Sequence, residues 1–248
     1  MNGHALLEAR EVTVRFGGLV AVDAVSAAFA PGELVGIIGP NGAGKTTFFN
    51  ALSGVIAPTA GEIFADGQRL TGRQPHRYAH QGVARTFQTP RVFADLSVAD
   101  NVNFGLQFAG RGRTASWLLQ DTASILNLIG LAAQAALPAA AITPSQQRLL
   151  EIGMALATRP KLLLLDEVAA GLTESEVQAM AQLIRRLRDE LDLTVIWIEH
   201  AVTTLLRHVE RVLVLHQGRK IADGTPAEVV RNPEVIEAYL GDEMVEPA

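Results

Sequence analysis

The chain of 248 residues lacks cysteine, is poor in charged residues and has no long hydrophobic run. Without cysteine it has no disulfide, no thiol nucleophile and no zinc–thiolate site. Charged residues make up only 19% of the chain against 48% hydrophobic residues, a balance that excludes an intrinsically disordered protein. The longest apolar stretch, Leu131 to Ile142, contains Gln134 and Pro138 and is too short for a membrane helix of about 20 apolar residues. The composition therefore predicts a folded protein that does not span a membrane.

Acidic residues mark both ends of the chain. Residues 1–11 contain Glu8 and Glu11 and no apolar segment typical of a secretory signal, so a cytoplasmic location is expected. The net charge is −5, and residues 232–248 contain five acidic and no basic residues. The rest of the chain is therefore close to neutral. It offers no strongly basic patch, so we expect no nucleic-acid partner.

Short strands alternate with helices along most of the chain. Apolar or alternating stretches predict strands over residues 11–16, 34–38, 83–87, 161–166 and 194–198, and a hairpin over residues 212–222. Residues 97–157 have helical spacing instead, with a loop at residues 110–113, and are expected to form a separate lobe. The alternation predicts an α/β fold with a largely parallel sheet.

Residues 39–46, Gly-Pro-Asn-Gly-Ala-Gly-Lys-Thr, match the phosphate-loop pattern G-x-x-x-x-G-K-[ST] between an apolar strand and a helix. Glycines let successive backbone N–H groups turn toward one anion, and the helix N-terminus adds partial positive charge. Lys45 would reach the β- and γ-phosphates of a nucleotide, and the Thr46 hydroxyl would bind Mg²⁺. The candidate nucleotide-binding residues of this segment are Gly39, Pro40, Asn41, Gly42, Ala43, Gly44, Lys45, Thr46 and Thr47.

An acidic pair, Asp166 and Glu167, follows the apolar run Leu162 to Leu165 at the end of an expected buried strand. In an open α/β sheet, ligands bind at such strand ends. Asp166 can serve a Mg²⁺ ion, directly or through water, and Glu167 can orient and polarise an attacking water. An apolar run before Asp-Glu is common in proteins, so this pair becomes specific only together with the phosphate loop.

With these motifs in this order, the chain resembles the ATP-binding subunits of ABC transporters from about Leu6 to Gly241. It is most similar to those of branched-chain amino-acid importers. The resemblance assigns Phe16, in Phe-Gly-Gly-Leu-Val-Ala-Val, to adenine stacking. The same Phe16 also continues the face of a strand formed by Val12 and Val14, which would make it a core residue.

Other motifs gain their roles from this resemblance alone. Gln88, in Arg-Thr-Phe-Gln, would sense Mg²⁺ and the transport subunit, and residues 170–173 resemble the D-loop. His200 resembles the switch histidine near the γ-phosphate. Residues 224–228 and 232–241 resemble the closing segment of the amino-acid importer branch.

One motif departs clearly from the family pattern. Where the family usually has Leu-Ser-Gly-Gly-Gln, this chain has Ile142-Thr-Pro-Ser-Gln146, a segment that in the family binds the γ-phosphate of the ATP held by the opposite subunit. Thr143 can N-cap the following helix, Pro144 suits its first position, and Gln146 completes a capping box. Thr143, Ser145 and Gln146 remain candidates for ATP binding. Because Pro144 removes one N–H, we expect ATP-driven pairing with an altered hydrolysis rate.

Two smaller departures remove no catalytic group. Val168 stands where a proline usually follows the catalytic glutamate, and it is expected to loosen the turn that aims Glu167. Ala201 and Val202 stand where an acidic residue and a methionine often follow the histidine.

The resemblance implies one ABC ATPase domain over residues 1–248. Its P-loop NTPase core would span about residues 1–88 and 159–248, with an N-terminal antiparallel β part, and its inserted α-helical lobe about residues 89–158. Two ATPase subunits, identical or different, would hold two ATP molecules between them. Membrane permease subunits would dock at the lobe near Gln88, which places the chain at the inner face of the cell membrane. The implied catalytic residues are Glu167, His200 and Gln88, and the implied Mg²⁺ ligands are Thr46, Gln88 and Asp166.

Other ABC systems and other phosphate-loop proteins are the alternatives. A soluble, non-transport ABC ATPase generally has two ATPase halves, coiled-coil arms or basic tails, and this chain shows one ATPase unit without sustained heptads or a basic block. A GTPase would carry an Asn-Lys-x-Asp motif, which is absent from the sequence. The ATPase of a lipopolysaccharide-transport system shares all these motifs and is the nearer rival.

Overall fold

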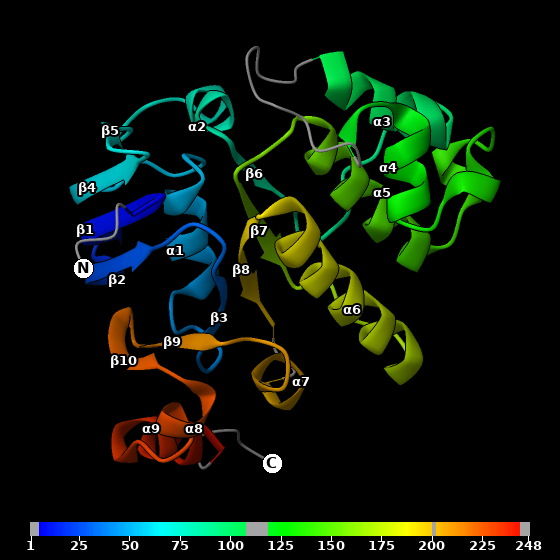
Figure 1. Cartoon of the computed structure of the whole chain (residues 1–248). Helices are drawn as coiled ribbons and strands as arrows, with labels where there is room; N and C mark the ends of the chain where they lie inside the picture. Colours follow the sequence, from blue (N-terminus) through cyan, green and yellow to red (C-terminus); the bar gives the residue numbers. More distant parts are fainter. Residues whose placement is uncertain (1–4, 108–118, 200–201, 244–248) are drawn as a thin grey trace.

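The computed structural model describes residues 5–107, 119–199 and 202–243, which form two β-sheets, helices that pack on them and a helical lobe (Figure 1). The first sheet is antiparallel, with the strand order β2-β1-β4-β5. Its strands are β1 (Leu7–Phe16), β2 (Leu19–Phe29), β4 (Ala60–Ala65) and β5 (Gln68–Arg69). The expected N-terminal antiparallel part is therefore present, although the strand pattern predicted only residues 11–16 of it.

The second sheet has the order β10-β9-β3-β8-β7-β6 and is parallel except for β10, which pairs antiparallel with β9. Its strands are β3 (Leu34–Ile38), β6 (Val83–Arg85), β7 (Leu162–Asp166), β8 (Thr194–Ile198), β9 (Arg211–His216) and β10 (Arg219–Gly224). β3 and β8 coincide with predicted strands, whereas β6 ends at Arg85 and leaves Phe87 in the following loop. The predicted α/β class with a largely parallel sheet is confirmed.

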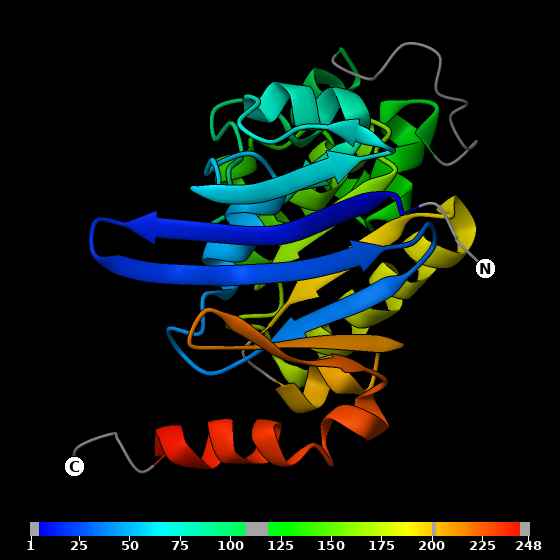
Figure 2. The same cartoon turned by 90° about the vertical axis from the view of Figure 1, so that its left-hand side faces the viewer.

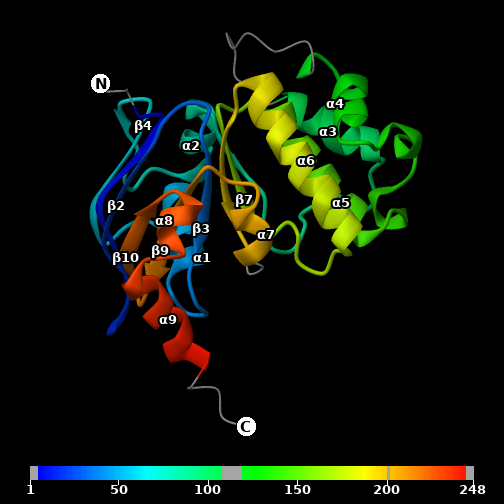
Figure 3. The ribbon, with the colours of Figure 1, turned by 60° about the horizontal axis from the view of Figure 1, so that its bottom comes forward.

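Helix α1 (Lys45–Leu52) lies between the two sheets, and α6 (Glu174–Leu191) covers the opposite face of the parallel sheet (Figures 1 and 3). Leu162 and Leu164 of β7 belong to the hydrophobic cluster around α1, together with residues of both sheets. Leu163 and Leu165 belong to the other cluster, which contains the buried face of α6. Both faces of β7 are thus buried, which accounts for a continuous run of leucines in place of alternation.

The helical lobe contains α3 (Val98–Gln107), α4 (Thr122–Leu128) and α5 (Pro144–Ala157). Helices α3 and α5 pack closely, because a Cβ atom on Gly105 would lie only 2.6 Å from the Met154 carbonyl oxygen. Helix α4 begins at Thr122, where the Asp121 side chain accepts a hydrogen bond from Ser124 N (2.8 Å). The expected loop at residues 110–113 lies outside the described residues.

The C-terminal part follows the predicted hairpin of β9 and β10, which turns at Gln217 and Gly218. Helices α8 (Pro226–Val229) and α9 (Pro233–Glu243) then pack beside this hairpin (Figures 2 and 3). Two short helices, α2 (Pro75–Gln81) and α7 (Val202–Leu206), precede β6 and β9 respectively. Within residues 5–107, 119–199 and 202–243, every helix is too short or too polar to cross a bilayer.

Candidate functional site

The phosphate loop connects β3 to α1 and is shaped by glycines with positive φ. Gly39, Gly42 and Gly44 have φ values of 154°, 75° and 94°. A Cβ atom on Gly44 would lie 2.3 Å from the Ala21 carbonyl oxygen, so no larger residue fits there. The N-cap residue of α1 is Gly44, which has no side chain to cap the helix, so the first backbone N–H groups of α1 are available to an anion.

Lys45 is the buried cation of this loop. Its Nζ donates hydrogen bonds to the carbonyl oxygens of Gly39 (2.6 Å) and Pro40 (2.9 Å). Burial lowers the pKa of Lys45, and the negative charge of Glu167 partly raises it again. The side chain is thus held over the loop by main-chain oxygens, where it can contact a phosphate without a large rearrangement.

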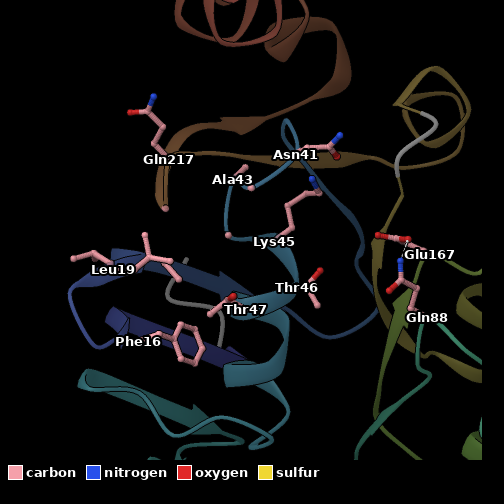
Figure 4. Close-up of a pocket in the computed structure, with 15 residues that line it drawn as sticks. Phe16, Leu19, Asn41, Ala43, Lys45, Thr46, Thr47, Gln88, Glu167 and Gln217 are labelled. Atoms are coloured by element: carbon pink, nitrogen blue, oxygen red, sulfur yellow. Dashed lines mark hydrogen bonds between the residues drawn. The ribbon is translucent and has the colours of Figure 1, made fainter. Parts of the chain in front are cut away.

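A cavity of about 650 Å³ opens in front of the phosphate loop (Figure 4). The cavity brings together most of the predicted nucleotide-binding residues with Gln88 and Glu167. Its predicted lining residues are Phe16, Asn41, Gly42, Ala43, Gly44, Lys45, Thr46, Thr47, Gln88 and Glu167. Gly39 and Pro40 do not line the cavity, but they hold Lys45 through their carbonyl oxygens.

Phe16 at the end of β1 has 51% of its surface exposed and lies at the rim of this cavity, so it is not the core residue that strand alternation allowed. The hairpin turn that ends β9 closes the cavity on another side, where Gly218 N donates to the Ala43 carbonyl oxygen (3.1 Å). Sequence reasoning missed this contact, because the sheet order rather than the local sequence places β9 next to β3. Leu19, Val20 and Ala21, from the segment that resembles the adenine-stacking loop, also line the cavity, and the lining residues that sequence reasoning missed are Gln217 and Gly218.

Gln88 and Glu167 meet across the cavity from the phosphate loop (Figure 4). Gln88 Nε2 donates to Glu167 Oε2 over 2.6 Å. Glu167 is only 5% exposed and has a left-handed backbone with φ of 51°, and its N–H donates to the Ile198 carbonyl oxygen (2.9 Å). Asp166, at the end of β7, forms an ion pair with Arg85 (3.3 Å) on β6. The sequence placed this acidic pair correctly at a strand end, whereas the partners come from other strands.

The turn after β7 is held by two side chains that sequence reasoning did not single out. Arg148 on α5 donates to the Glu167 carbonyl oxygen (2.6 Å). Glu199, directly after β8, accepts hydrogen bonds from Ala169 N (2.7 Å) and Trp197 Nε1 (3.0 Å), and burial raises its pKa. Val168 is buried beside these contacts. Arg148 of α5 and Glu199, directly after β8, thus hold the turn that carries Glu167.

Glu151 on α5 is a third functional candidate that sequence reasoning missed. It is 5% exposed, and its two carboxylate oxygens accept the N–H groups of Phe87 (3.3 Å) and Arg91 (2.9 Å), which flank Gln88. Burial raises the pKa of Glu151 to about 7, although these hydrogen bonds and the charges of Arg85 and Arg91 act in the opposite direction. A helical pattern alone gives no signal for such a contact.

The raised pKa of Glu151 predicts a loss of stability between about pH 4.5 and pH 7. Below this window the carboxyl is neutral in both the folded and the unfolded chain, and above it the folded chain contains a buried charge. The free energy of unfolding of Glu151→Gln, relative to the native chain, should therefore rise by about 3 kcal/mol from pH 4.5 to pH 8. Urea unfolding of both proteins at the two pH values measures this difference. An unchanged difference would contradict the buried charge.

The Thr143–Gln146 segment forms the predicted start of α5 but lies apart from the phosphate loop. Thr143 accepts a hydrogen bond from Gln146 N (3.2 Å), and Gln146 Oε1 accepts one from Thr143 N (3.0 Å), so the predicted capping box is present. Thr143, Ser145 and Gln146 line a different cavity of about 620 Å³ against α6. Within one chain, these candidates are thus not brought to Lys45. His200, the remaining candidate, lies outside the described residues.

The residues proposed for Mg²⁺ suit an ion that is shared with a nucleotide. Within the described ranges, no group of three or more His, Asp and Glu side chains could hold a metal by itself. Mg²⁺ usually takes one or two protein oxygens together with substrate phosphates and waters. The Thr46 hydroxyl and the Gln88 side chain line the cavity, and the Asp166 carboxylate lies at the end of β7, which β8 separates from β3. This set of hard oxygen donors fits Mg²⁺ in the presence of bound phosphates.

A phosphate loop between a buried parallel strand and a helix, with an acidic pair at the end of another strand of the same sheet, defines a P-loop nucleotide-binding protein. The family model described as ABC transporter matches residues 22–170, and a model described as branched-chain amino acid ATP-binding cassette transporter matches residues 219–245. The chain belongs to the ABC transporter ATP-binding cassette family, which hydrolyses ATP to power transport. The family expected from the motifs is confirmed.

Several curated proteins match nearly the whole chain. The high-affinity branched-chain amino acid transport ATP-binding protein BraF of Pseudomonas aeruginosa is 39% identical over 250 residues, which cover 96% of this chain and 98% of that protein. The corresponding protein LivG of Escherichia coli K12 is 39% identical over 251 residues with the same coverage. The lipopolysaccharide export system ATP-binding protein LptB of Acidithiobacillus ferridurans is 35% identical over 238 residues, also covering 96% and 98%.

Solved cassette structures share the fold. An ATP-binding cassette of an ABC transporter in its ADP conformation, MJ1267, superposes with a TM-score of 0.84 at 27% identity and covers 96% of this chain and 99% of its own. A dimeric bacterial cassette, MJ0796, has a TM-score of 0.77 at 24% identity and covers 89% and 98%. The predicted fold, a P-loop core with an antiparallel β part and a helical lobe, is that of these cassettes.

Proposed function

We propose that the chain is the ATP-hydrolysing subunit of an importer for branched-chain or related amino acids. The match of residues 219–245 to the model of branched-chain amino acid cassettes carries this proposal. Two relatives at 39% identity are named for the same transport, whereas the lipopolysaccharide export relative stands at 35%. The described part of this match, residues 219–243, contains β10, α8 and α9, which belong to neither the phosphate loop nor the lobe.

The chemistry we assign to the cavity is in-line attack of water on the γ-phosphate of ATP, which breaks the bond between this phosphate and ADP and releases ADP and phosphate. Backbone N–H groups of residues 39–47 and the Lys45 ammonium would hold the phosphates, while Phe16 at the rim would stack on adenine. Glu167 would orient the attacking water, and Gln88 fixes the Glu167 carboxylate through the 2.6 Å hydrogen bond. His200 would stabilise the γ-phosphate. When bound, Mg²⁺ would offset phosphate charge, held by Thr46, Gln88 and Asp166.

A second cassette would complete each site. The Thr143–Gln146 segment lines a separate cavity, so it can reach the γ-phosphate only of an ATP bound to a partner. A head-to-tail pair, with identical or different subunits, brings this segment of one chain to the phosphate loop of the other. The dimeric cassette among the structural neighbours has the same fold and supports this arrangement.

The permease would dock at the lobe, close to the loop that carries Gln88. Phe93 and Phe104 are 43% and 41% exposed and contact each other edge to face at 4.8 Å, which offers an apolar surface there. Val98 and Val102 are fully buried and serve the lobe core instead. We therefore place the chain at the inner face of the cell membrane, bound to permease subunits, with no role in nucleic-acid binding.

Restoring the family pattern in the Thr143–Gln146 segment should raise the hydrolysis rate. Replacing Pro144 and Ser145 with Gly-Gly returns the missing N–H, and one charge-assisted hydrogen bond to a phosphate is worth about 10–100-fold in rate. The matched control replaces Pro226 and Ala227 with Gly-Gly, because α8 starts with the same capping-box geometry far from the cavity. Steady-state ATPase assays compare the variants. A lower rate in the Pro144-Ser145 variant would contradict an impaired native segment.

Uptake by intact cells tests the proposed function. Cells without this gene should lose high-affinity uptake of radiolabelled leucine, isoleucine and valine, and the native gene should restore it. The gene encoding Glu167→Gln should not restore it, although the protein accumulates to the same level. Undiminished uptake of all three amino acids in the deletion strain would show that the chain serves another transport system.

A further inference from the structure

The loop that carries Gln88 is bound at both ends by one buried carboxylate, Glu151 of α5. Glu151 Oε2 accepts the N–H of Phe87 (3.3 Å), and Glu151 Oε1 accepts the N–H of Arg91 (2.9 Å). These two N–H groups lie on either side of Gln88 in the chain. The carboxylate therefore holds the loop by its main chain at Phe87 and at Arg91, with Gln88 between these two hydrogen bonds.

Cation–π stacking of arginine side chains on Phe87 makes this loop compact. The Phe87 ring lies between two guanidinium groups, with Arg91 Cζ at 4.0 Å and Arg85 Cζ at 4.4 Å from its centroid. Arg85 is itself tied to Ser53 Oγ (2.8 Å) next to α1. Within this compact loop, the Gln88 amide extends to Glu167 Oε2 at 2.6 Å. A shift of the main chain at Phe87 or Arg91 would therefore move the Gln88 amide away from Glu167.

Helix α5 contacts both the turn that carries Glu167 and the loop that carries Gln88. Arg148 and Glu151 are three residues apart and share one face of the helix. Arg148 donates to the Glu167 carbonyl oxygen (2.6 Å), while Glu151 holds the loop of Gln88. The same continuous helix begins at Pro144, in the segment that would contact the ATP of a partner subunit. A displacement of α5 would thus act on both residues of the pair together.

A buried charge is a costly way to stabilise a helix. Glu151 is 5% exposed, and an apolar residue or a neutral amide at this position would avoid the desolvation of a carboxylate. A neutral amide, however, has only one acceptor oxygen and would present an N–H group to one of the two backbone donors. Only a carboxylate accepts both backbone N–H groups. A glutamate at this position is therefore explained by these two hydrogen bonds and not by a contribution to stability.

We propose that Glu151 is a positioning residue for ATP hydrolysis: it holds the loop that places Gln88 against Glu167 and links the position of α5 to that contact. The proposal rests on the roles proposed above for Gln88 and Glu167. Glu151 does not touch the nucleotide cavity, so it acts on the reaction only through the loop.

Steady-state ATPase kinetics of the purified full-length chain test this role. Glu151→Gln should lower kcat by about tenfold or more, since a displacement of 1 Å in a catalytic group can cost 10²-fold. KM for ATP should stay unchanged, because the phosphate loop is untouched. The variant should be at least as stable as the native chain at pH 8, which a loss of structure would not produce. Glu190→Gln, an exposed glutamate on α6, is the matched control and should keep the native kcat.

A double-mutant cycle with Gln88→Ala separates positioning from a general effect on the fold. If Glu151 acts through Gln88, then Glu151→Gln should change kcat less than twofold when Gln88 is already alanine. A second variant, Glu151→Asp, keeps the charge but is too short to reach both N–H groups. Like Glu151→Gln, it should lower kcat in the native chain and change kcat less than twofold when Gln88 is already alanine. Hydrogen exchange should also become faster at the amides of Phe87 and Arg91 in both variants.

The possible outcomes distinguish the two proposals. A native kcat in Glu151→Gln and Glu151→Asp, or rate losses that multiply in the cycle, would overturn the positioning role and leave the proposed function intact. A native kcat in Gln88→Ala would overturn the assignment of Gln88 and the role of Glu151 with it. A native rate in Glu167→Gln would overturn the proposed mechanism itself.

Discussion

Replacement of Glu167 with glutamine is expected to slow ATP hydrolysis by about 10²–10³-fold while ATP still binds. Glutamine has nearly the same shape as glutamate, and its one side-chain oxygen can still accept the hydrogen bond from Gln88. In the native chain this bond joins Gln88 Nε2 to Glu167 Oε2 over 2.6 Å. It cannot carry the negative charge that polarises the attacking water. The phosphate loop and Lys45 lie on the opposite side of the cavity and keep their contacts (Figure 4). Binding and hydrolysis should therefore separate in this variant.

Two measurements check the Glu167→Gln result. The rate of phosphate release at saturating Mg-ATP should fall, while the Kd for a fluorescent ATP analogue should stay within about twofold of the native value. Glu190→Gln makes the same chemical change at an exposed position of α6 and should leave both quantities unchanged. A native rate of phosphate release would show that another group serves as the catalytic carboxylate.

Replacement of Lys45 with alanine is expected to weaken ATP binding itself, by about 10–100-fold in Kd, the value of one hydrogen bond to a charged group. The Lys45 ammonium is held over the phosphate loop by the Gly39 and Pro40 carbonyl oxygens, at 2.6 and 2.9 Å. The variant leaves these two oxygens without their donor and removes the positive charge that faces the phosphates. Both effects disfavour the bound nucleotide.

A titration of the Lys45→Ala chain with the fluorescent analogue measures this loss. Lys161→Ala is the matched control, because Lys161 is an exposed lysine paired with Asp66 and lies outside the cavity. The control should bind ATP like the native chain. An unchanged Kd for Lys45→Ala would mean that backbone N–H groups alone bind the phosphates.

The phosphate loop and the acidic pair were predictable because their chemistry depends on neighbours in the sequence. The run Leu162 to Leu165 predicts a strand buried on both faces, and the strand indeed ends at Asp166. The glycines of residues 39–44 predict a loop that turns its N–H groups inward, and three of them have positive φ. In such segments the local sequence is sufficient, because strand, loop and helix follow one another directly.

Contacts between distant segments were not predictable in this way. The Glu151 carboxylate accepts the N–H groups of Phe87 and Arg91, and the Glu199 carboxylate accepts Ala169 N. These partners lie far apart in the sequence, and only the order of the strands brings them together. On a helical pattern, Glu151 is an ordinary polar position of α5. The exposure of Phe16 has the same origin, since alternation along β1 cannot show where the second sheet leaves the strand end uncovered.

ATP hydrolysis in this cavity is proposed to drive amino-acid import. Its most direct test is the uptake of radiolabelled leucine by proteoliposomes that contain the transport complex assembled with this chain, with Mg-ATP on the side of the ATPase subunits. The native complex should accumulate leucine as ATP is consumed, and the complex with Glu167→Gln should bind ATP without accumulating it. Leucine accumulation at the native rate by the Glu167→Gln complex, or ATP consumption by the native complex without uptake of any branched-chain amino acid, would contradict the claim.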